Sequence, residues 1–344
     1  MQNKLTQSGD LLNASGELVE CGYATSLIKR YDRTMIKAGK LRIKEWDYYL
    51  IYNNDFGVAL TIDDNSYMGL NSVSLLNFKE RTEITKSPMK FMTLGKTNFP
   101  STSKVGDVSA TNKNYKFEFK NDGTKRELYV WLKNFSGGKD ITINLLLQDE
   151  PQDSMVIVTP FKENKKAFYY NQKIVGLKAS GSVLFGNEQI TFDSKNTRAI
   201  LDWGRGVWTY KNTWYWGAGT GIVDGAEVGF NIGYGFGDTS AASENMVFYN
   251  GKAHKLTDVS FNIPKKKNGK EDFLAPWTFS SSDGRFEMNF TPLLDRHANS
   301  DILIIASNQH QVFGLFNGTI ILDDGKKVTL NNFLGFAEKV VNKW

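Results

Sequence analysis

Residues 202–216 bring together the side chains of this sequence that are best suited to chemistry. The segment reads Asp-Trp-Gly-Arg-Gly-Val-Trp-Thr-Tyr-Lys-Asn-Thr-Trp-Tyr-Trp and holds four of the eight tryptophans, beside Asp202 and Arg205. A buried indole needs a partner for its N–H, and burial penalises an unpaired carboxylate or guanidinium. The segment therefore predicts either a packed seam or the wall of a pocket for a large apolar molecule, with Arg205 as the nearest partner for Asp202.

Three residues are candidates for catalysis: Asp202, Arg205 and Glu244. In the functional interpretation, Asp202 is an acid held beside aromatic rings for proton transfer to an apolar substrate. In the structural interpretation, it forms an ion pair with Arg205 that closes a domain junction. A second carboxylate near Asp202 would favour acid–base chemistry, and Glu244 and Glu45 are the available acids. Each glutamate, taken alone, is more typical of a solvated strand end.

The spacing of aromatic side chains predicts a wall for ligand binding. Trp214 and Trp216 lie two residues apart, as do Trp46 and Tyr48, and residues with this spacing share one face of a strand. Each pair can therefore line the same cavity, one pair from each half of the chain. His254 follows a predicted turn and is more typical of a hydrogen bond at a loop edge than of proton transfer. The candidate ligand contacts are Glu45, Trp46, Tyr48, Trp203, Trp208, Trp214, Trp216, Asn245 and His254.

The sequence offers neither a metal-ligand motif nor a nucleotide-binding loop. It holds one cysteine, Cys21, and three scattered histidines, none of them at metal-ligand spacing. The glycine-rich stretches 217–221 and 233–237 lack the lysine and the following helix that phosphate loops require. We therefore expect no transition metal and no cofactor.

Charge and hydropathy favour a small molecule as the partner. The net charge of +5 is mild, and the basic run 265–270 has no interleaved aromatic residues, so nucleic acid is not expected. The first residues lack the apolar segment of a secretory signal, and the longest apolar run is far shorter than a membrane span. We expect a soluble, cytoplasmic protein.

Period-two alternation of apolar and polar residues dominates the chain. Residues 115–120 alternate, Asn121-Asp122-Gly123 forms a turn signal, and residues 127–132 alternate again, which predicts a hairpin. Clean helical periodicity is missing, and 344 residues suit two domains of ordinary size. The two aromatic pairs, about half a chain apart, favour a duplication. Short strands with turns every 8–12 residues are typical of antiparallel barrels or sandwiches. We predict an all-β fold of two tandem antiparallel barrels with few short helices: residues 1–203 with an N-terminal extension, and 204–344, with the junction between about 195 and 212.

Residues 202–208 and 214–217 resemble the core signature of the bacterial family catalogued as domain of unknown function 2804. Further matching segments are 44–49, 244–245, 251–256, 276–277, 313–318 and 335–338, so the resemblance covers about residues 10–344. The layout is more distantly similar to the carotenoid 1,2-hydratase and AttH-like group, whose members carry two tandem lipocalin-like barrels. That resemblance implies that the two predicted barrels are lipocalin-like, and that Asp202 corresponds to the acid of the group's acidic-aromatic motif. The sequence departs from the group directly after it, because Trp203 and Gly204 stand where relatives have His or Arg and then Glu.

Three hypotheses about function follow. The first is a protein that binds an apolar or amphipathic small molecule in a barrel mouth or in the cleft between barrels. The second is an enzyme of the hydratase, isomerase or cyclase type, in which Asp202 donates a proton to an alkene-like substrate and aromatic walls stabilise positive charge. The third is a structural or interaction protein whose tryptophans hold the barrels together. Whether the tryptophans line a cavity or are fully packed separates the first two from the third.

Overall fold

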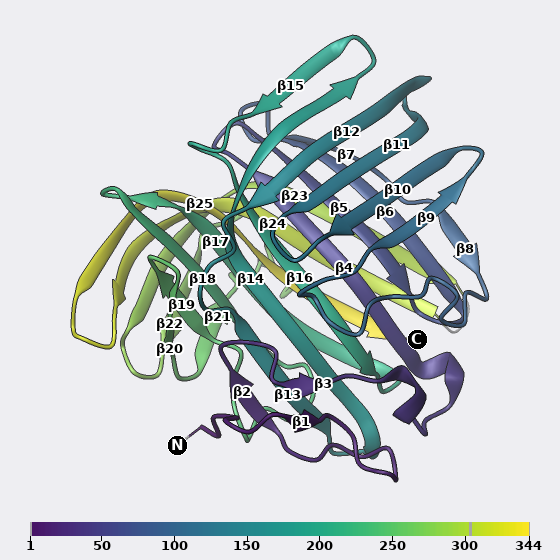
Figure 1. Cartoon of the computed structure of the whole chain (residues 1–344). Helices are drawn as coiled ribbons and strands as arrows, with labels where there is room; N and C mark the ends of the chain where they lie inside the picture. The colour runs from purple at the N-terminus through teal and green to yellow at the C-terminus, as the bar shows by residue number, and fades with distance from the viewer. Residues whose placement is uncertain (1, 303–304, 344) are drawn as a thin grey trace.

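The computed structural model describes residues 2–302 and 305–343, and these form an all-β protein, as predicted (Figure 1). Two single-turn 3₁₀ helices, η1 (Arg33–Met35) and η2 (Lys40–Arg42), are the only helices among the described residues. The strands form a 14-stranded sheet, a 9-stranded sheet, and a small parallel pair made by β1 (Gly9–Asp10) and β3 (Lys29–Arg30).

The first sheet is antiparallel and has the spatial order β7-β6-β5-β4-β16-β14-β12-β11-β10-β9. Its bounds are β7 (Thr82–Lys86), β6 (Met68–Asn77), β5 (Phe56–Asp64), β4 (Ile43–Tyr52), β16 (Arg198–Val207), β14 (Asn164–Phe185), β12 (Lys139–Gln148), β11 (Arg126–Ser136), β10 (Tyr115–Asn121) and β9 (Val108–Asn112). Four strands lie off this path. They are β13 (Met155–Phe161) and β15 (Glu188–Phe192) beside β14, β2 (Gly22–Ala24) beside β13, and β8 (Met89–Phe91) beside β6.

The second sheet is also antiparallel, in the order β20-β19-β18-β17-β25-β24-β23-β22-β21. Its bounds are β20 (Lys252–Lys255), β19 (Met246–Tyr249), β18 (Ala226–Tyr234), β17 (Lys211–Val223), β25 (Lys327–Lys343), β24 (Ile305–Ile321), β23 (Phe286–Ile302), β22 (Trp277–Ser281) and β21 (Val259–Asn262).

Alternation along the strands produces these sheets. The predicted hairpin forms as β10 and β11, and its turn is closed by Asn121 Oδ1, which accepts the Gly123 N–H at 3.0 Å. Phe117 lies opposite Val130, which in turn lies opposite Ile143 of β12, and all three are fully buried. Apolar residues at every second position thus build one face of the sheet against the core.

Both sheets curl, so that distant strands approach one another. In the first sheet, Lys86 of β7 donates a hydrogen bond to the Lys133 carbonyl of β11 at 3.1 Å. In the second, the rings of Tyr234 on β18 and Phe261 on β21 pack edge to face with centroids 5.5 Å apart. This curling gives the barrel-like shape expected of the fold.

The chain leaves the first sheet at Val207 and enters the second at Lys211. Strand β16 therefore runs past residue 203, where the sequence analysis places the end of the first domain, and the division into domains stays a prediction. The N-terminal residues also reach the second half of the chain, because the Asn3 N–H donates to the Ala241 carbonyl at 2.8 Å.

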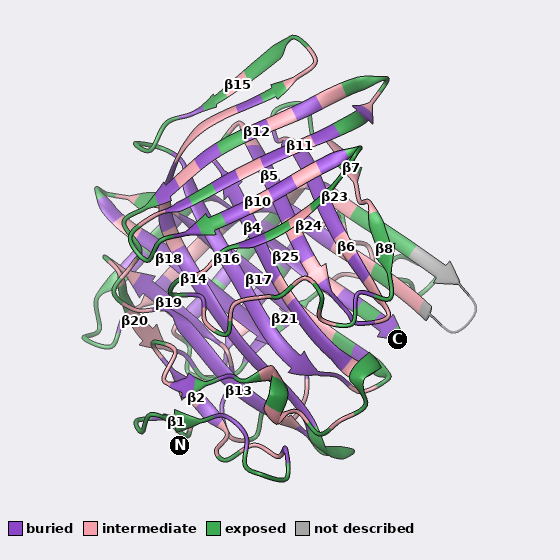
Figure 2. Cartoon of the chain, turned by 45° about the vertical axis from the view of Figure 1, so that its right-hand side comes forward, coloured by how far each residue is buried: buried purple, intermediate pink, exposed green. Residues whose placement is uncertain are grey.

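The outer face of the first sheet packs against the second, and buried residues run through the middle of the molecule (Figure 2). Tyr52 of β4 joins the two sheets across the seam between them. Its hydroxyl accepts the Thr220 N–H at 2.7 Å and donates to the Leu334 carbonyl at 3.3 Å. One hydrophobic core fills the first barrel and continues into this seam. A separate core around Phe230 and Phe316 fills the second barrel.

Candidate functional site

Two rows of side chains face each other across the seam between the sheets. On the first sheet, strand register aligns Tyr48 of β4, Asp202 of β16 and Lys173 of β14. On the second sheet, the register aligns four residues in one row: Arg296, Gln311, Glu338 and Trp216, from β23, β24, β25 and β17. Residues that lie opposite one another on neighbouring strands point to the same face. Both rows therefore point into the seam.

Direct contacts join the rows and enclose a cavity of about 460 Å³ between them. The Tyr48 hydroxyl donates to Gln311 Oε1 at 3.4 Å. The ammonium of Lys173 lies 3.7 Å from the centre of the Trp216 ring, a cation–π contact. Seven of the twelve candidate residues from the sequence line this cavity: Trp46, Tyr48, Asp202, Trp208, Trp214, Trp216 and Glu244.

The partner of Asp202 is Lys173, not the predicted Arg205. The Lys173 ammonium lies 2.8 Å from Asp202 Oδ1, and Asn171 donates a hydrogen bond to the same oxygen at 2.6 Å. Lys173 is only 3% exposed, and Asp202 is also buried, so each charge compensates the other. Asp202 and Arg205 are three residues apart on one strand, and such residues point to opposite faces.

Arg205 lies on the other face of β16, inside the first barrel. Its guanidinium pairs with Asp47 at 3.0 Å and donates to the Trp46 carbonyl at 2.7 Å. The guanidinium carbon also lies 4.3 Å from the centre of the Trp203 ring. Arg205 thus anchors the barrel interior and has no access to the cavity.

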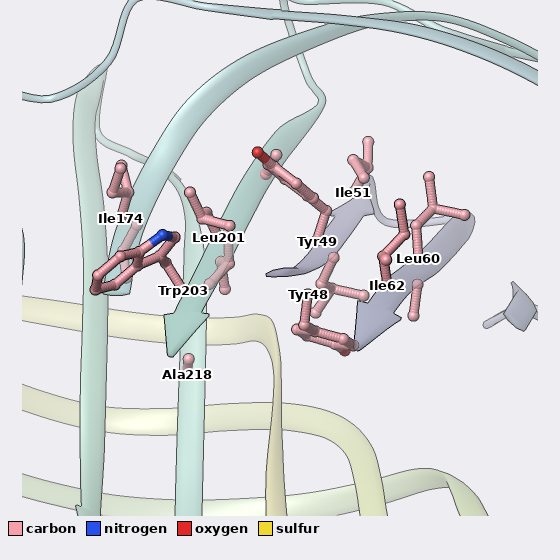
Figure 3. Packing of buried hydrophobic residues seen from close by; sticks show 14 of the residues in the cluster. Tyr48, Tyr49, Ile51, Leu60, Ile62, Ile174, Leu201, Trp203 and Ala218 are labelled. Carbon is pink, nitrogen blue, oxygen red and sulfur yellow. The ribbon is translucent and has the colours of Figure 1, made fainter. Parts of the chain in front are cut away.

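Trp203 and Glu45 also face away from the cavity, contrary to the expectation. Trp203 is 1% exposed and packs edge to face against Tyr31 and Tyr170, in the hydrophobic cluster that Figure 3 shows. Glu45 accepts a hydrogen bond from the Tyr31 hydroxyl at 2.9 Å and forms an ion pair with Arg33. The cause is the alternation of side chains along a strand. Trp203 follows Asp202 and Glu45 precedes Trp46, and both Asp202 and Trp46 line the cavity. Figure 3 shows the same alternation at Tyr48 and Tyr49, which leave β4 on opposite sides.

Asn245 and His254 serve local structure and do not line the cavity. Asn245 Oδ1 accepts the Gly233 N–H at 2.7 Å, and its amide donates to the Thr257 carbonyl at 2.9 Å. His254 lies on β20, where its Nδ1 is 3.2 Å from a carboxylate oxygen of Asp323.

Glu244 reaches the cavity from the segment before β19. The Asn231 amide donates to its Oε2 at 3.2 Å. Gly233 leaves room for this carboxyl, because a Cβ at that position would lie 2.6 Å from Glu244 Oε1. Burial raises the pKa of Glu244, while the nearby Lys173 ammonium opposes that shift.

Glu338 is the acid of the second row, and it is not among the site residues predicted from the sequence. Its Oε1 accepts the indole N–H of Trp214 at 2.9 Å, and its Oε2 accepts the Gln311 amide at 3.1 Å. The residue is 3% exposed. Burial raises the pKa of Glu338 to about 7, against the lowering effect of the Trp214 hydrogen bond and the Lys173 charge. A carboxyl of this kind exchanges its proton near neutral pH.

An aromatic cluster forms the apolar part of the cavity. Trp208 packs edge to face against Trp46, Trp214 and Phe236, with centroids 5.2, 5.9 and 4.8 Å apart, and Tyr169 stacks on Trp46 at 6.1 Å. Gly204 makes this arrangement possible, because its missing Cβ would lie 1.9 Å from the Trp46 ring.

Four polar residues of the two facing rows are not among the candidates from the sequence: Lys173, Arg296, Gln311 and Glu338. A signal existed for two of them. Lys173 interrupts the largely apolar strand 167–177, and Glu338 ends the segment 335–338 that carries part of the family resemblance. Arg296 and Gln311 lie in strands with several polar residues, and no pattern in the sequence separates them from solvated positions.

Comparisons with known proteins yield a family model and several solved structures of low sequence identity. The family model described as "Domain of unknown function (DUF2804)" matches residues 2–344. Kievitone hydratase from Nectria haematococca superposes with a TM-score of 0.50 at 12% identity, over 88% of each chain. An AttH protein from Nitrosomonas europaea gives 0.44 at 14% identity, over 90% of this chain and 96% of that one. CghA in complex with Sch210972 gives 0.45 at 10% identity, over 97% of each chain.

No curated protein matches the sequence significantly. Across residues 2–302 and 305–343, the structure contains no helix that is long and apolar enough to cross a membrane.

Proposed function

The chain belongs to the DUF2804 family, and from that premise we propose that it binds an amphipathic small molecule with an apolar ring system in the cavity between the two sheets. One observation carries the proposal: the aromatic cluster and the buried groups Asp202, Lys173 and Glu338 converge on one cavity. Ligand pockets in proteins combine mainly apolar and aromatic walls with a few placed polar groups. The volume of about 460 Å³ lies within the usual range for such pockets, roughly 300–1,000 Å³.

A purely structural seam would not need these charges. Replacing a buried ion pair by packed apolar residues is often neutral or stabilising. The Asp202–Lys173 pair also lies within the first sheet, so it does not itself join the two sheets. Trp203 does fit the structural hypothesis, because it is packed inside the first barrel. Trp208, Trp214 and Trp216, in contrast, line the cavity. The tryptophan-rich segment therefore supports both the fold and the pocket.

A binding experiment with the neutral fluorophore N-phenylnaphthylamine tests the proposal. Thr61 of β5 lies opposite Tyr48 and lines the cavity, so Thr61→Trp should fill the cavity without removing a charged group. Thr191→Trp, on the exposed edge strand β15, is the matched control. We expect wild type and Thr191→Trp to bind the fluorophore alike, and Thr61→Trp to lose at least about tenfold in affinity, which corresponds to about 1.4 kcal/mol. Unchanged binding by Thr61→Trp, or no binding by the wild type, would refute a ligand-binding cavity.

Acid–base catalysis is a second candidate function, and the pKa of Glu338 favours it. The earlier expectation gave the proton-donor role to Asp202, but Lys173 already compensates that carboxylate at 2.8 Å. Glu338, with a pKa of about 7, can hold a proton near neutral pH and release it to a bound alkene. Water then adds to the resulting cation, and the proton lost from that water returns to Glu338. The rings of Trp46 and Trp214 would stabilise the cation in the meantime.

Solvent exchange distinguishes catalysis from binding alone. The compound that co-purifies with the wild type is extracted, identified by mass spectrometry and incubated with fresh protein in deuterium oxide. Catalysis by Glu338 predicts that deuterium enters a carbon position with the wild type and not with Glu338→Gln. Incorporation at equal rates with both proteins would contradict the role of Glu338, and no incorporation with either would leave binding as the function.

A further inference from the structure

Arg296 is a cation of the cavity that lacks an ionic partner among the described residues. Its Nη1 donates to Gln311 Oε1 at 2.6 Å, and this is the one hydrogen bond of its side chain in that part of the chain. Lys173, which lines the same cavity, differs in this respect, since it pairs with Asp202. The guanidinium has five N–H donors, so most of its hydrogen-bonding capacity is open at the cavity wall.

Gln311 keeps Arg296 apart from the nearest acid of its row. The Oε1 of Gln311 accepts from Arg296 and from the Tyr48 hydroxyl, and its Nε2 donates to Glu338. The amide thus stands between the guanidinium and the carboxyl of Glu338, and both ends of the amide are engaged. Arg296 and Glu338 are connected in this way without forming an ion pair.

A second polar group of the same wall is also incompletely satisfied. Asn342 lines the cavity and is 1% exposed, and its Oδ1 has no hydrogen-bond partner within residues 2–302 and 305–343. Native proteins rarely leave a buried acceptor unpaired. The wall formed by β23, β24 and β25 therefore offers a ligand open hydrogen-bond donors at Arg296 and one open acceptor at Asn342, whereas the aromatic cluster suits its apolar part. Only the donors of Arg296 match an anionic group.

We infer that the ligand is an amphipathic organic acid whose carboxylate pairs with Arg296 while its rings lie against the aromatic cluster. This inference rests on the proposed function and narrows the class of its ligand. A planar guanidinium matches a carboxylate through two parallel hydrogen bonds. A charge-assisted pair of this kind inside a cavity is weakly screened by salt.

Competition with matched compounds tests the inference on the wild type. Naphthoate and its neutral isostere naphthamide share the ring system and differ in charge, and each is titrated against bound N-phenylnaphthylamine. We expect naphthoate to displace the fluorophore at about tenfold lower concentration than naphthamide. Equal potency, or a preference for naphthamide, would overturn the inference.

Variants assign the preference to Arg296. In Arg296→Gln the advantage of naphthoate over naphthamide should disappear, and a near-ultraviolet circular dichroism spectrum like that of the wild type checks that the variant is folded. Arg30→Gln, an exposed arginine paired with Asp10 far from the cavity, is the control and should keep the preference. A naphthoate preference that survives Arg296→Gln would overturn the assignment. Failure of the fluorophore to bind the wild type would instead refute the proposed function.

Discussion

Replacing Glu338 by glutamine tests the electrostatics of the cavity, because the side chain keeps its shape and loses its ability to ionise. Its two oxygens accept hydrogen bonds from Trp214 and Gln311, and burial raises the pKa of the carboxyl from 4.5 to about 7. The glutamine retains one carbonyl oxygen for Trp214. Its amino group faces the Gln311 amide, so the variant loses a hydrogen bond at every pH, at a cost of about 1 kcal/mol.

The pH dependence follows from the direction of the pKa shift. Below pH 4.5 the carboxyl of Glu338 is protonated in the folded and unfolded chain, and its ionisation contributes nothing to stability. Between pH 4.5 and about 7 the unfolded chain releases the proton while the folded protein keeps it, so wild-type stability falls as pH rises. A difference of one in pKa corresponds to about 1.4 kcal/mol, so the wild type loses about 3 kcal/mol across this window. Glu338→Gln avoids the loss and should gain about 3 kcal/mol relative to wild type between pH 4 and pH 8.

Urea unfolding followed by tryptophan fluorescence between pH 4 and pH 8 measures this difference. The change with pH is the decisive quantity, because the lost hydrogen bond only adds a constant offset. Glu188→Gln, on the exposed strand β15, controls for the change in net charge. A difference between wild type and Glu338→Gln that stays flat over this range would refute the reasoning. It would show that Lys173 and the hydrogen-bond donors keep Glu338 ionised in the folded protein.

Three further substitutions test the packing around the cavity. Gly204→Ala places a methyl group 1.9 Å from the Trp46 ring, so we expect a loss of about 3 kcal/mol in thermal unfolding and a weaker near-ultraviolet circular dichroism signal; an unchanged signal would contradict the contact. Asp202→Ala leaves the ammonium of Lys173 buried and unpaired and should cost about 3–5 kcal/mol, a loss that the double replacement Asp202→Ala with Lys173→Met largely restores. Arg205→Met should destabilise the protein by a similar amount, since it leaves the buried carboxylate of Asp47 without its ionic partner. The same variant should keep its affinity for the fluorophore, because Arg205 lies outside the cavity.

Much of the fold could be predicted from the sequence because strand patterns are local. The period-two alternation in residues 115–120 and 127–132 and the turn between them predict the β10–β11 hairpin, which the structure contains. The same spacing rule places Trp46 with Tyr48, and Trp214 with Trp216, on faces that line the cavity. These predictions need only the residues within one strand.

The alternation of side chains along a strand also explains why three of the predicted residues lie outside the cavity. Trp203 and Arg205 have odd numbers on the strand where Asp202 has an even one, so parity alone excludes them from the wall that Asp202 lines. Glu45 is excluded from the cavity wall in the same way, because its neighbour Trp46 points into the cavity. Lys173 is different, because its pairing with Asp202 depends on the register between β14 and β16, and these strands are separated by an edge hairpin. No local pattern fixes such a pairing in advance.

The register of the second sheet specifies the cavity and the hydrophobic core together. On β24, Val312 is fully buried in the second core while its neighbour Gln311 faces the cavity, and on β25 the same holds for Ala337 and Glu338. A slip of one residue in either strand would turn the glutamine or the glutamate into the apolar core, where an unpaired polar group is strongly disfavoured. The packing of the second barrel therefore holds Arg296, Gln311 and Glu338 in one row. For this reason the polar groups of the site can be exchanged one at a time by isosteric residues without disturbing the alternation that builds the fold.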